Sequence, residues 1–232
     1  MIRTVLGVAL AAALGWAGYG VLHAHRTESG GVSVAGERLC IPPDRVVFSE
    51  ATLAPSGDYD EATPGGFVRV RLPAEAVIEA VPGFSPTLER TLRVNGEART
   101  LTLQQSIGAM ITPRADNGPW IARLVQDTHG RRLQPLAGTG QPGLWGLETR
   151  RGARSATWQV FSGQEPDGGS YWGSCTTMDP ADPSALECRR HLARGTLSVE
   201  YPLAGGNIAH HAAIDRLLSG LLEDWRCGMA QD

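Results

Sequence analysis

The sequence lacks lysine, so all 21 of its basic residues are arginines. Aromatic residues are also scarce, at 6% of the chain. The formal net charge is -3, and the sequence contains no run of like charges. Without a basic stretch we expect no nucleic-acid partner. We attribute the missing lysines to the base composition of a GC-rich bacterial genome, and we infer no arginine-based site from them.

Motifs for phosphate, nucleotide and metal binding are missing as well. There is no Walker loop, no G-x-G-x-x-G after a strand and no C-x-x-C pair of the kind that supplies zinc ligands. Ser106 lacks the first glycine of a nucleophile elbow, and His211 with Asp215 would need further ligands to form a metal site. We therefore predict a non-enzymatic protein without metal or cofactor. A hydrolase whose catalytic residues are dispersed along the chain is an alternative that motifs would not show.

The first 26 residues contain the longest apolar stretch. Residues 5–22 carry no charge, and at about 1.5 Å per residue they span about 27 Å, close to the thickness of a hydrocarbon core. We predict that residues 1–26 form a retained transmembrane helix. A cleaved secretory signal is the alternative, because Arg3 and the Ala/Gly/Leu-rich centre suit both.

The rest of the chain divides in two. Residues 27–36 are small and mostly polar, as in a flexible tether, and residues 37–232 are enough for a single α+β domain. With an anchor, the protein is a single-pass protein of the bacterial inner membrane whose domain faces the periplasm. With a cleaved signal, it is a soluble periplasmic protein.

Four cysteines agree with export, because an even number in a chain with a targeting segment indicates disulfides. Three pairings exist. We favour Cys175 with Cys188, because the turn-rich stretch between them can bring two strand ends together. The other two, Cys40 and Cys227, would then join the start of the domain to its last helix. Such a long loop would stabilise the fold by about 4 to 5 kcal/mol in the chain-entropy model.

Alternation of apolar and polar residues predicts many strands. Residues 91–101 give the clearest signal, because Asn95-Gly96 separates two alternating arms, as in a tight antiparallel hairpin. Residues 66–72 alternate as a half-buried strand. Further strands are predicted at 120–126, 132–136, 144–149, 157–161, 170–175 and 196–201.

One convincing helix follows these strands. It begins at Asn207 as a cap and continues to Trp225, with apolar residues three and four positions apart. Short helices at 75–80 and 104–110 are weaker predictions. The predicted fold is therefore α+β, an antiparallel β-sheet meander with a C-terminal amphipathic helix packed on it, behind an N-terminal transmembrane helix.

Tryptophans are the candidate binding residues. Tryptophan is favoured at binding hot spots, and Trp120 and Trp172 adjoin turns rich in proline and glycine. We predict both as partner-binding residues. Trp158 and Trp225 we assign to the core.

The order of these parts resembles that of membrane-anchored periplasmic immunity proteins of bacteria, which neutralise type VI secretion toxins. The features that carry the resemblance are the apolar N-terminal segment, Leu39-Cys-Ile-Pro42, the Cys175 to Cys188 bridge, the strand at 195–201 and the closing helix. It covers the beginning and the final quarter of the chain and assigns no residue a role. It implies a membrane-tethered periplasmic binding protein with a protein partner, in its most concrete form a toxin. An accessory component of a secretion or conjugation apparatus is the alternative.

Overall fold

The structure is a computed structural model. It describes residues 31–49, 66–94, 97–115, 123–124, 133–136, 143–152, 155–163, 171–177 and 186–227. The predicted membrane helix at residues 1–26 lies outside these ranges. Within them, no helix has both the length and the apolar character that crossing a bilayer requires.

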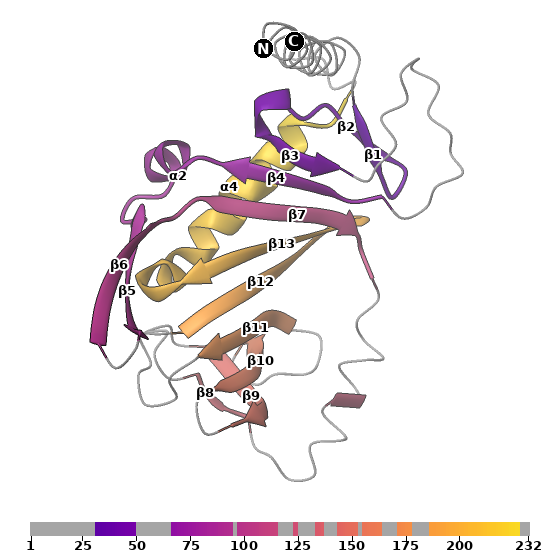
Figure 1. Ribbon diagram of the computed structural model, residues 1–232. Helices are drawn as coiled ribbons and strands as arrows, with labels where there is room; N and C mark the ends of the chain where they lie inside the picture. The colour runs from indigo at the N-terminus through magenta and orange to yellow at the C-terminus, as the bar shows by residue number, and fades with distance from the viewer. Residues whose placement is uncertain are drawn as a thin grey trace, which may run out of the picture.

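A nine-stranded antiparallel sheet forms the body of the domain (Figure 1), in the order β3-β4-β7-β13-β12-β11-β10-β9-β8. From β8 to β13, neighbours in sequence are neighbours in the sheet, which is the predicted meander. Pairing of β13 with β7 joins this meander to β4 and β3. The strands are β3 (Val46–Ser49), β4 (Val68–Leu72), β7 (Ile107–Pro113), β8 (Gln134–Pro135), β9 (Leu144–Arg151), β10 (Ala156–Ser162), β11 (Tyr171–Thr177), β12 (Leu186–Arg194) and β13 (Leu197–Ala204).

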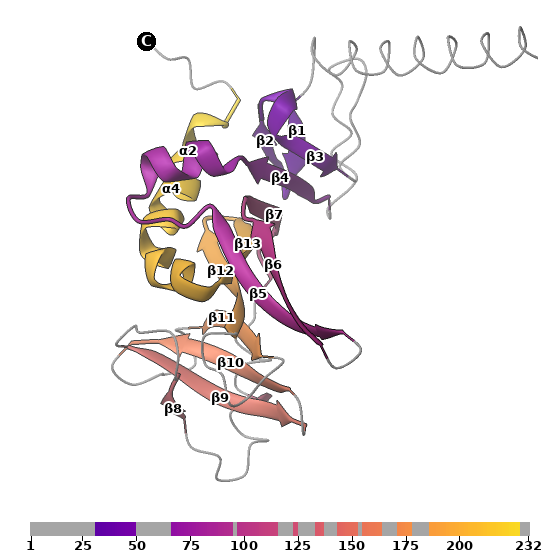
Figure 2. The same cartoon turned by 60° about the vertical axis from the view of Figure 1, so that its left-hand side comes forward.

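The C-terminal helix covers one face of this sheet, as predicted. The 3-10 helix η3 (Gly205–His210) leads directly into α4 (His211–Asp224). The buried residues Ile214, Leu218 and Leu222 recur every four positions and form the stripe that packs on the sheet. A shorter helix, α2 (Ala74–Ala80), lies beside α4 (Figure 2). We call the opposite side of the sheet the open face.

The two ends of the described chain meet. β1 (Val32–Val34) and β2 (Glu37–Leu39) form a separate hairpin, followed by the 3-10 helix η1 (Pro43–Arg45). Leu39 bridges to Arg226 after α4. Val32 and Val34 are buried, so residues 31–36 belong to the folded domain and not to the tether predicted at 27–36. The small residues around the two valines resemble a linker in composition and hide the alternation.

Three further local predictions differ from the structure. Residues 104–110 do not form a helix. Ile107 and Ala109 are buried and alternate with less buried residues, which is the strand pattern of β7. Residues 123–124, inside a predicted strand, are helical. β12 is absent from the sequence-based predictions, because Arg190 occupies an inward position and breaks the apolar alternation.

A β-bulge in β11 decides where Trp172 points. Val160 pairs with Gly173 and Phe161 with Tyr171, which leaves Trp172 as the extra residue. Its side chain turns into the core. Gly173 permits this with a φ of 150°, and a Cβ atom there would lie 2.1 Å from the carbonyl oxygen of Arg189. A side chain at position 173 is therefore incompatible with the bulge.

Replacing Gly173 by alanine is expected to lower the free energy of unfolding by about 3 kcal/mol, because the backbone must leave this conformation or displace β12. Gly220→Ala is the matched control. Gly220 lies in α4 with nothing within 4 Å of its Cβ position, and alanine should raise stability there by about 0.5 to 1 kcal/mol. Urea unfolding of both oxidised variants measures the difference, and wild-type stability of Gly173→Ala would contradict the bulge.

Candidate functional site

Both predicted disulfides are present. Cys40 is joined to Cys227, and Cys175 to Cys188, which are the pairs that the sequence favours. Cys175 and Cys188 face each other directly across β11 and β12. None of the described cysteines is free. The cysteines therefore hold the frame of the domain together.

Trp172, one of the two candidate tryptophans, lies in the core. Trp172 is 1% exposed and packs against the guanidinium of Arg190 and the ring of His211, at 5.2 and 5.4 Å between centres. The bulge places Trp172 in the core, so its side chain has almost no exposed surface for a partner to contact. The predicted partner-binding role would require an exposed side chain. Trp120 lies outside the described residues.

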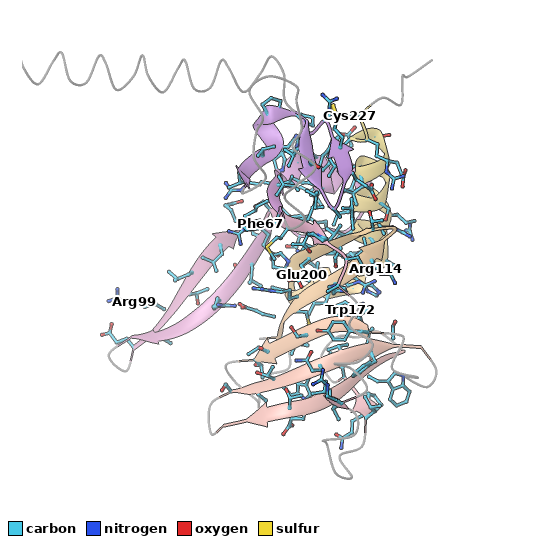
Figure 3. All side chains as sticks on the ribbon, turned by 90° about the vertical axis from the view of Figure 1, so that its right-hand side faces the viewer. Phe67, Arg99, Arg114, Trp172, Glu200 and Cys227 are labelled. Atoms are coloured by element: carbon cyan, nitrogen blue, oxygen red, sulfur yellow. A yellow bond between two sulfur atoms is a disulfide. The ribbon has the colours of Figure 1, made fainter. Side chains whose placement is uncertain are left out.

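A hairpin, which we call the arm, projects from the domain (Figure 2). It consists of β5 (Thr87–Val94) and β6 (Glu97–Gln104), which pair along their whole length. The two residues between them are Asn95-Gly96, so the predicted hairpin is confirmed and is longer than expected. Every residue of β6 is exposed. The arm extends away from the side of the sheet that α4 covers, with Arg99 towards its far end (Figure 3).

One face of the arm is apolar near its root. Leu88 lies opposite Leu103, and Arg90 lies opposite Leu101, so these four residues share a face. Leu101 and Leu103 are 44% and 40% exposed. An isolated two-stranded hairpin is barely stable in water. The arm therefore depends on the rest of the domain for its position while it keeps apolar surface accessible.

Asn207 fixes the root of the arm. Its side-chain nitrogen donates hydrogen bonds to the Ser85 carbonyl oxygen and to Gln105 Oε1, both at 2.9 Å. Its side-chain oxygen accepts a hydrogen bond from the Ser85 N–H at 2.8 Å. Because Ser85 precedes β5 and Gln105 follows β6, one buried side chain holds both strands. The predicted capping role is wrong, because the Asn207 oxygen is engaged by the arm and makes no cap hydrogen bond.

A second attachment lies farther along the arm. Arg90 of β5 forms an ion pair with Glu187 of β12. Both side chains are partly exposed to solvent, so this pair adds little stability by itself. It does restrict the angle between the arm and the sheet.

Replacing Asn207 by alanine is expected to loosen the arm and to lower the free energy of unfolding by about 2 kcal/mol, because three hydrogen bonds are lost and buried partners are left unsatisfied. Hydrogen exchange of the arm amides should become faster than that of the nine-stranded sheet. Ser85→Ala is the comparison, since Asn207 bonds only to the backbone of Ser85. That variant keeps all three Asn207 hydrogen bonds and loses only the one from Ser85 Oγ to the Thr87 carbonyl oxygen, at 2.7 Å, so its effect on the arm should be smaller. Unchanged arm exchange in Asn207→Ala would contradict the role of Asn207.

A groove runs between the arm and the open face. Its first part is a cavity of about 520 Å³, with Leu88 and Leu103 of the arm on one side and Thr176 of β11 on the other. Its second part, a cavity of about 320 Å³, continues over β4, β7 and β13. Both cavities adjoin, because they share the lining residues Ser106, Arg189 and Pro202.

The second part of the groove is positively charged. Arg69, Arg71 and Arg189 line it together with one acidic residue, Glu200. Within the described residues, Arg69 and Arg71 form no ion pair, and Arg189 is 3.9 Å from Glu200 in an exposed pair. Sequence reasoning missed this site. The sequence signal for it is the predicted strand at 66–72, because both outward residues of its final five positions are arginines.

A serine and a histidine also meet on the open face. Ser198 Oγ lies 2.6 Å from His191 Nε2, and His191 pairs across the sheet with Glu200. Burial lowers the pKa of His191, against an opposing effect of Glu200. Ser198 is 2% exposed, so its hydroxyl is not accessible for attack on a substrate. Its backbone lies between two paired strands, so its N–H is not free to stabilise an oxyanion. The contact is a buried structural hydrogen bond.

His211 and Asp215, one helical turn apart, form no hydrogen bond or ion pair with each other. His211 Nδ1 contacts the Ile208 carbonyl oxygen at 3.2 Å, and burial lowers the pKa of the imidazole. Asp215 instead binds Arg190 of β12. Among the residues that the structure describes, no group of three or more His, Cys, Asp or Glu is arranged to hold a metal ion.

Comparisons with known proteins add one distant similarity. No protein-family model and no curated protein sequence matches the chain. One solved structure, the iron-regulated outer membrane lipoprotein FrpD of Neisseria meningitidis, aligns with a TM-score of 0.38 and 10% sequence identity. The alignment covers 85% of this chain and 94% of that chain. A similarity of this size establishes neither a shared family nor a shared function.

Proposed function

We propose that this chain is a membrane-tethered periplasmic binding protein that holds a protein partner in the groove beneath the arm. In its most concrete form it is an immunity protein that neutralises an envelope-active toxin. The observation that carries the proposal is the arm itself. It presents exposed leucines over a groove, yet the buried Asn207 holds it at its root.

The surface chemistry of the groove supports a protein partner. Leu101 and Leu103 are exposed apolar side chains beside a groove lined by charged residues, a combination typical of interaction sites. The attachments at Asn207 and Arg90 orient the arm before the partner arrives. Less ordering is then needed on binding, which favours affinity.

The compartment in the proposal is supported by the two disulfides, because such bonds persist in oxidising compartments such as the periplasm. The predicted membrane helix at residues 1–26 would keep the domain at the inner membrane. A toxin that acts in the envelope would meet the domain there.

A competition experiment tests the proposal. A strain without this gene is expected to be outgrown by its parent when both are grown in contact, and the wild-type gene should restore its survival. Leu101→Asp with Leu103→Asp should not restore survival, because the charges oppose burial of the arm against a partner. Ile78→Asp is the matched control, since Ile78 is 43% exposed but lies on α2.

Two results would overturn the proposal. Equal survival of the deletion strain and its parent would show that the protein does not confer immunity. Full rescue by the double aspartate variant would show that the leucines of the arm do not bind the partner. Matching melting temperatures of the variants and the wild type show that each result reports binding and not folding.

A further inference from the structure

Building on the proposed function, we infer that the partner presents an extended acidic segment, whose carboxylates bind Arg69 and Arg71 while its apolar side chains contact the leucines of the arm. The groove has these two chemistries in a fixed order. Leu88 and Leu103 line its first part, Arg189 lies where the two parts meet, and the β4 arginines line the far part.

The β4 arginines are available for a ligand. Arg69 and Arg71 are exposed, alternate with buried valines and form no ion pair within the described residues. As residues two apart on a strand, their Cα atoms lie about 7 Å apart on the same face. Guanidinium groups so placed can each form paired hydrogen bonds with a carboxylate. The net charge of the whole chain is -3, so this positive surface is local.

The remaining lining favours a peptide over a small anion. Glu187 lines the first part of the groove and Glu200 the second, so the groove contains hydrogen-bond acceptors as well as arginines. The same acidic side chains can accept hydrogen bonds from peptide N–H groups. Val47, which is 44% exposed, and Met110 add apolar contacts beside the arginines. A polypeptide segment supplies carboxylates, N–H groups and apolar side chains together.

A peptide-binding experiment tests this inference. The full chain is purified in detergent micelles and titrated into a fluorescent eight-residue peptide with two leucines followed by four acidic residues. A matched peptide carries asparagine and glutamine in place of the acidic residues. We expect the acidic peptide to bind about tenfold more tightly or better, because charge-assisted hydrogen bonds are lost in the neutral one.

Variants locate the effect. Arg69→Gln with Arg71→Gln should abolish the preference for the acidic peptide. Arg216→Gln should keep it, because Arg216 is an exposed arginine on α4, which covers the opposite face of the sheet. A shared melting temperature shows that the glutamine variants are folded.

Each contrary result overturns the inference. Equal binding of the two peptides would show that the groove does not recognise an acidic segment. An unchanged preference in the double glutamine variant would show that Arg69 and Arg71 do not bind it. Displacement of the acidic peptide by an equal concentration of inorganic phosphate would show a simple anion site instead. The competition experiment tests the proposed function independently of the peptide. If the gene protects the strain but the acidic peptide does not bind preferentially, the partner has a different chemistry from the one inferred here.

Discussion

Removing the Cys40 to Cys227 disulfide, by changing both cysteines to serine, is expected to lower the free energy of unfolding by about 4 to 5 kcal/mol. The sequence separation of the two cysteines is 187, and the chain-entropy model assigns a large cost to freeing so long a loop in the unfolded state. Because domains of this size have a total stability of about 5 to 15 kcal/mol, the variant should lose at least about a quarter of its stability.

Further contacts beside this disulfide also connect the two ends of the domain. The Cys227 N–H donates a hydrogen bond to the Arg38 carbonyl oxygen at 3.0 Å, and Arg226 pairs with Glu37 and Glu223. The contacts with Arg38 and Glu37 join β2 to the residues that follow α4, and they would be weakened together. They are exposed enough that they cannot replace the covalent link.

The second disulfide provides the comparison. Cys175 and Cys188 are separated by 13 residues, so serine at both positions should cost about 3 kcal/mol in the same model. Urea unfolding under non-reducing conditions measures both double variants against the wild type. An equal or smaller loss for the Cys40 and Cys227 variant would contradict the account of how the chain ends are held.

Replacing Asp215 by alanine is expected to lower the free energy of unfolding by about 3 to 5 kcal/mol. Arg190 donates hydrogen bonds from Nε and Nη2 to Asp215 Oδ2, at 3.1 and 2.7 Å. Both side chains are only 14% exposed, where β12 meets α4. Without Asp215 the guanidinium stays buried with no counter-charge, and that uncompensated charge dominates the loss.

Tyr201 completes this network. Its hydroxyl donates a hydrogen bond to Asp215 Oδ1 at 2.6 Å. Burial, together with the negative charge of Asp215, raises the pKa of Tyr201 well above its usual value, so the phenol stays protonated and keeps donating. The alanine variant would lose this bond as well.

A double variant separates charge from packing. Arg190→Met with Asp215→Leu removes both charges and keeps apolar volume, so it should lose less stability than Asp215→Ala alone. Thermal unfolding of the double variant and of its two component single variants, Arg190→Met and Asp215→Leu, gives the comparison. A loss in the double variant that equals the sum of the single losses would show that the pair does not couple β12 to α4.

Local patterns in the sequence were enough for several elements. Asn95-Gly96 predicts the hairpin because the turn needs residues that tolerate positive φ. The C-terminal helix follows from leucines and isoleucines at helical spacing. The cysteine pairing follows from a turn-rich stretch between two of the four cysteines.

Features that depend on distant contacts could not be predicted. Arg190 points inward because Asp215 of α4 meets it, and Trp172 is buried because Gly173 allows a bulge. Asn207 has a helix-capping position in the sequence, but its hydrogen bonds go to residues more than a hundred positions away. Tertiary contacts override local preference at each of these residues.

The groove is the largest omission for the same reason. Arg69 and Arg71 are visible as outward residues of a strand, but Arg189 joins them only through the long-range order of β4, β7, β13 and β12. The hairpin pattern likewise predicts strands without showing that they project from the domain and cover a cavity. Surface sites that several strands build together require the sheet order first.

The most direct test of the partner-binding groove is site-specific photocrosslinking in living cells that express the full chain. A photoreactive residue is placed at Leu103, beside the groove, and separately at Arg216, on α4. We predict that the Leu103 position yields one defined protein adduct, which disappears in the Arg69→Gln and Arg71→Gln background, and that the Arg216 position yields none. The same adduct from both positions, or no adduct from Leu103, would contradict a partner held beneath the arm.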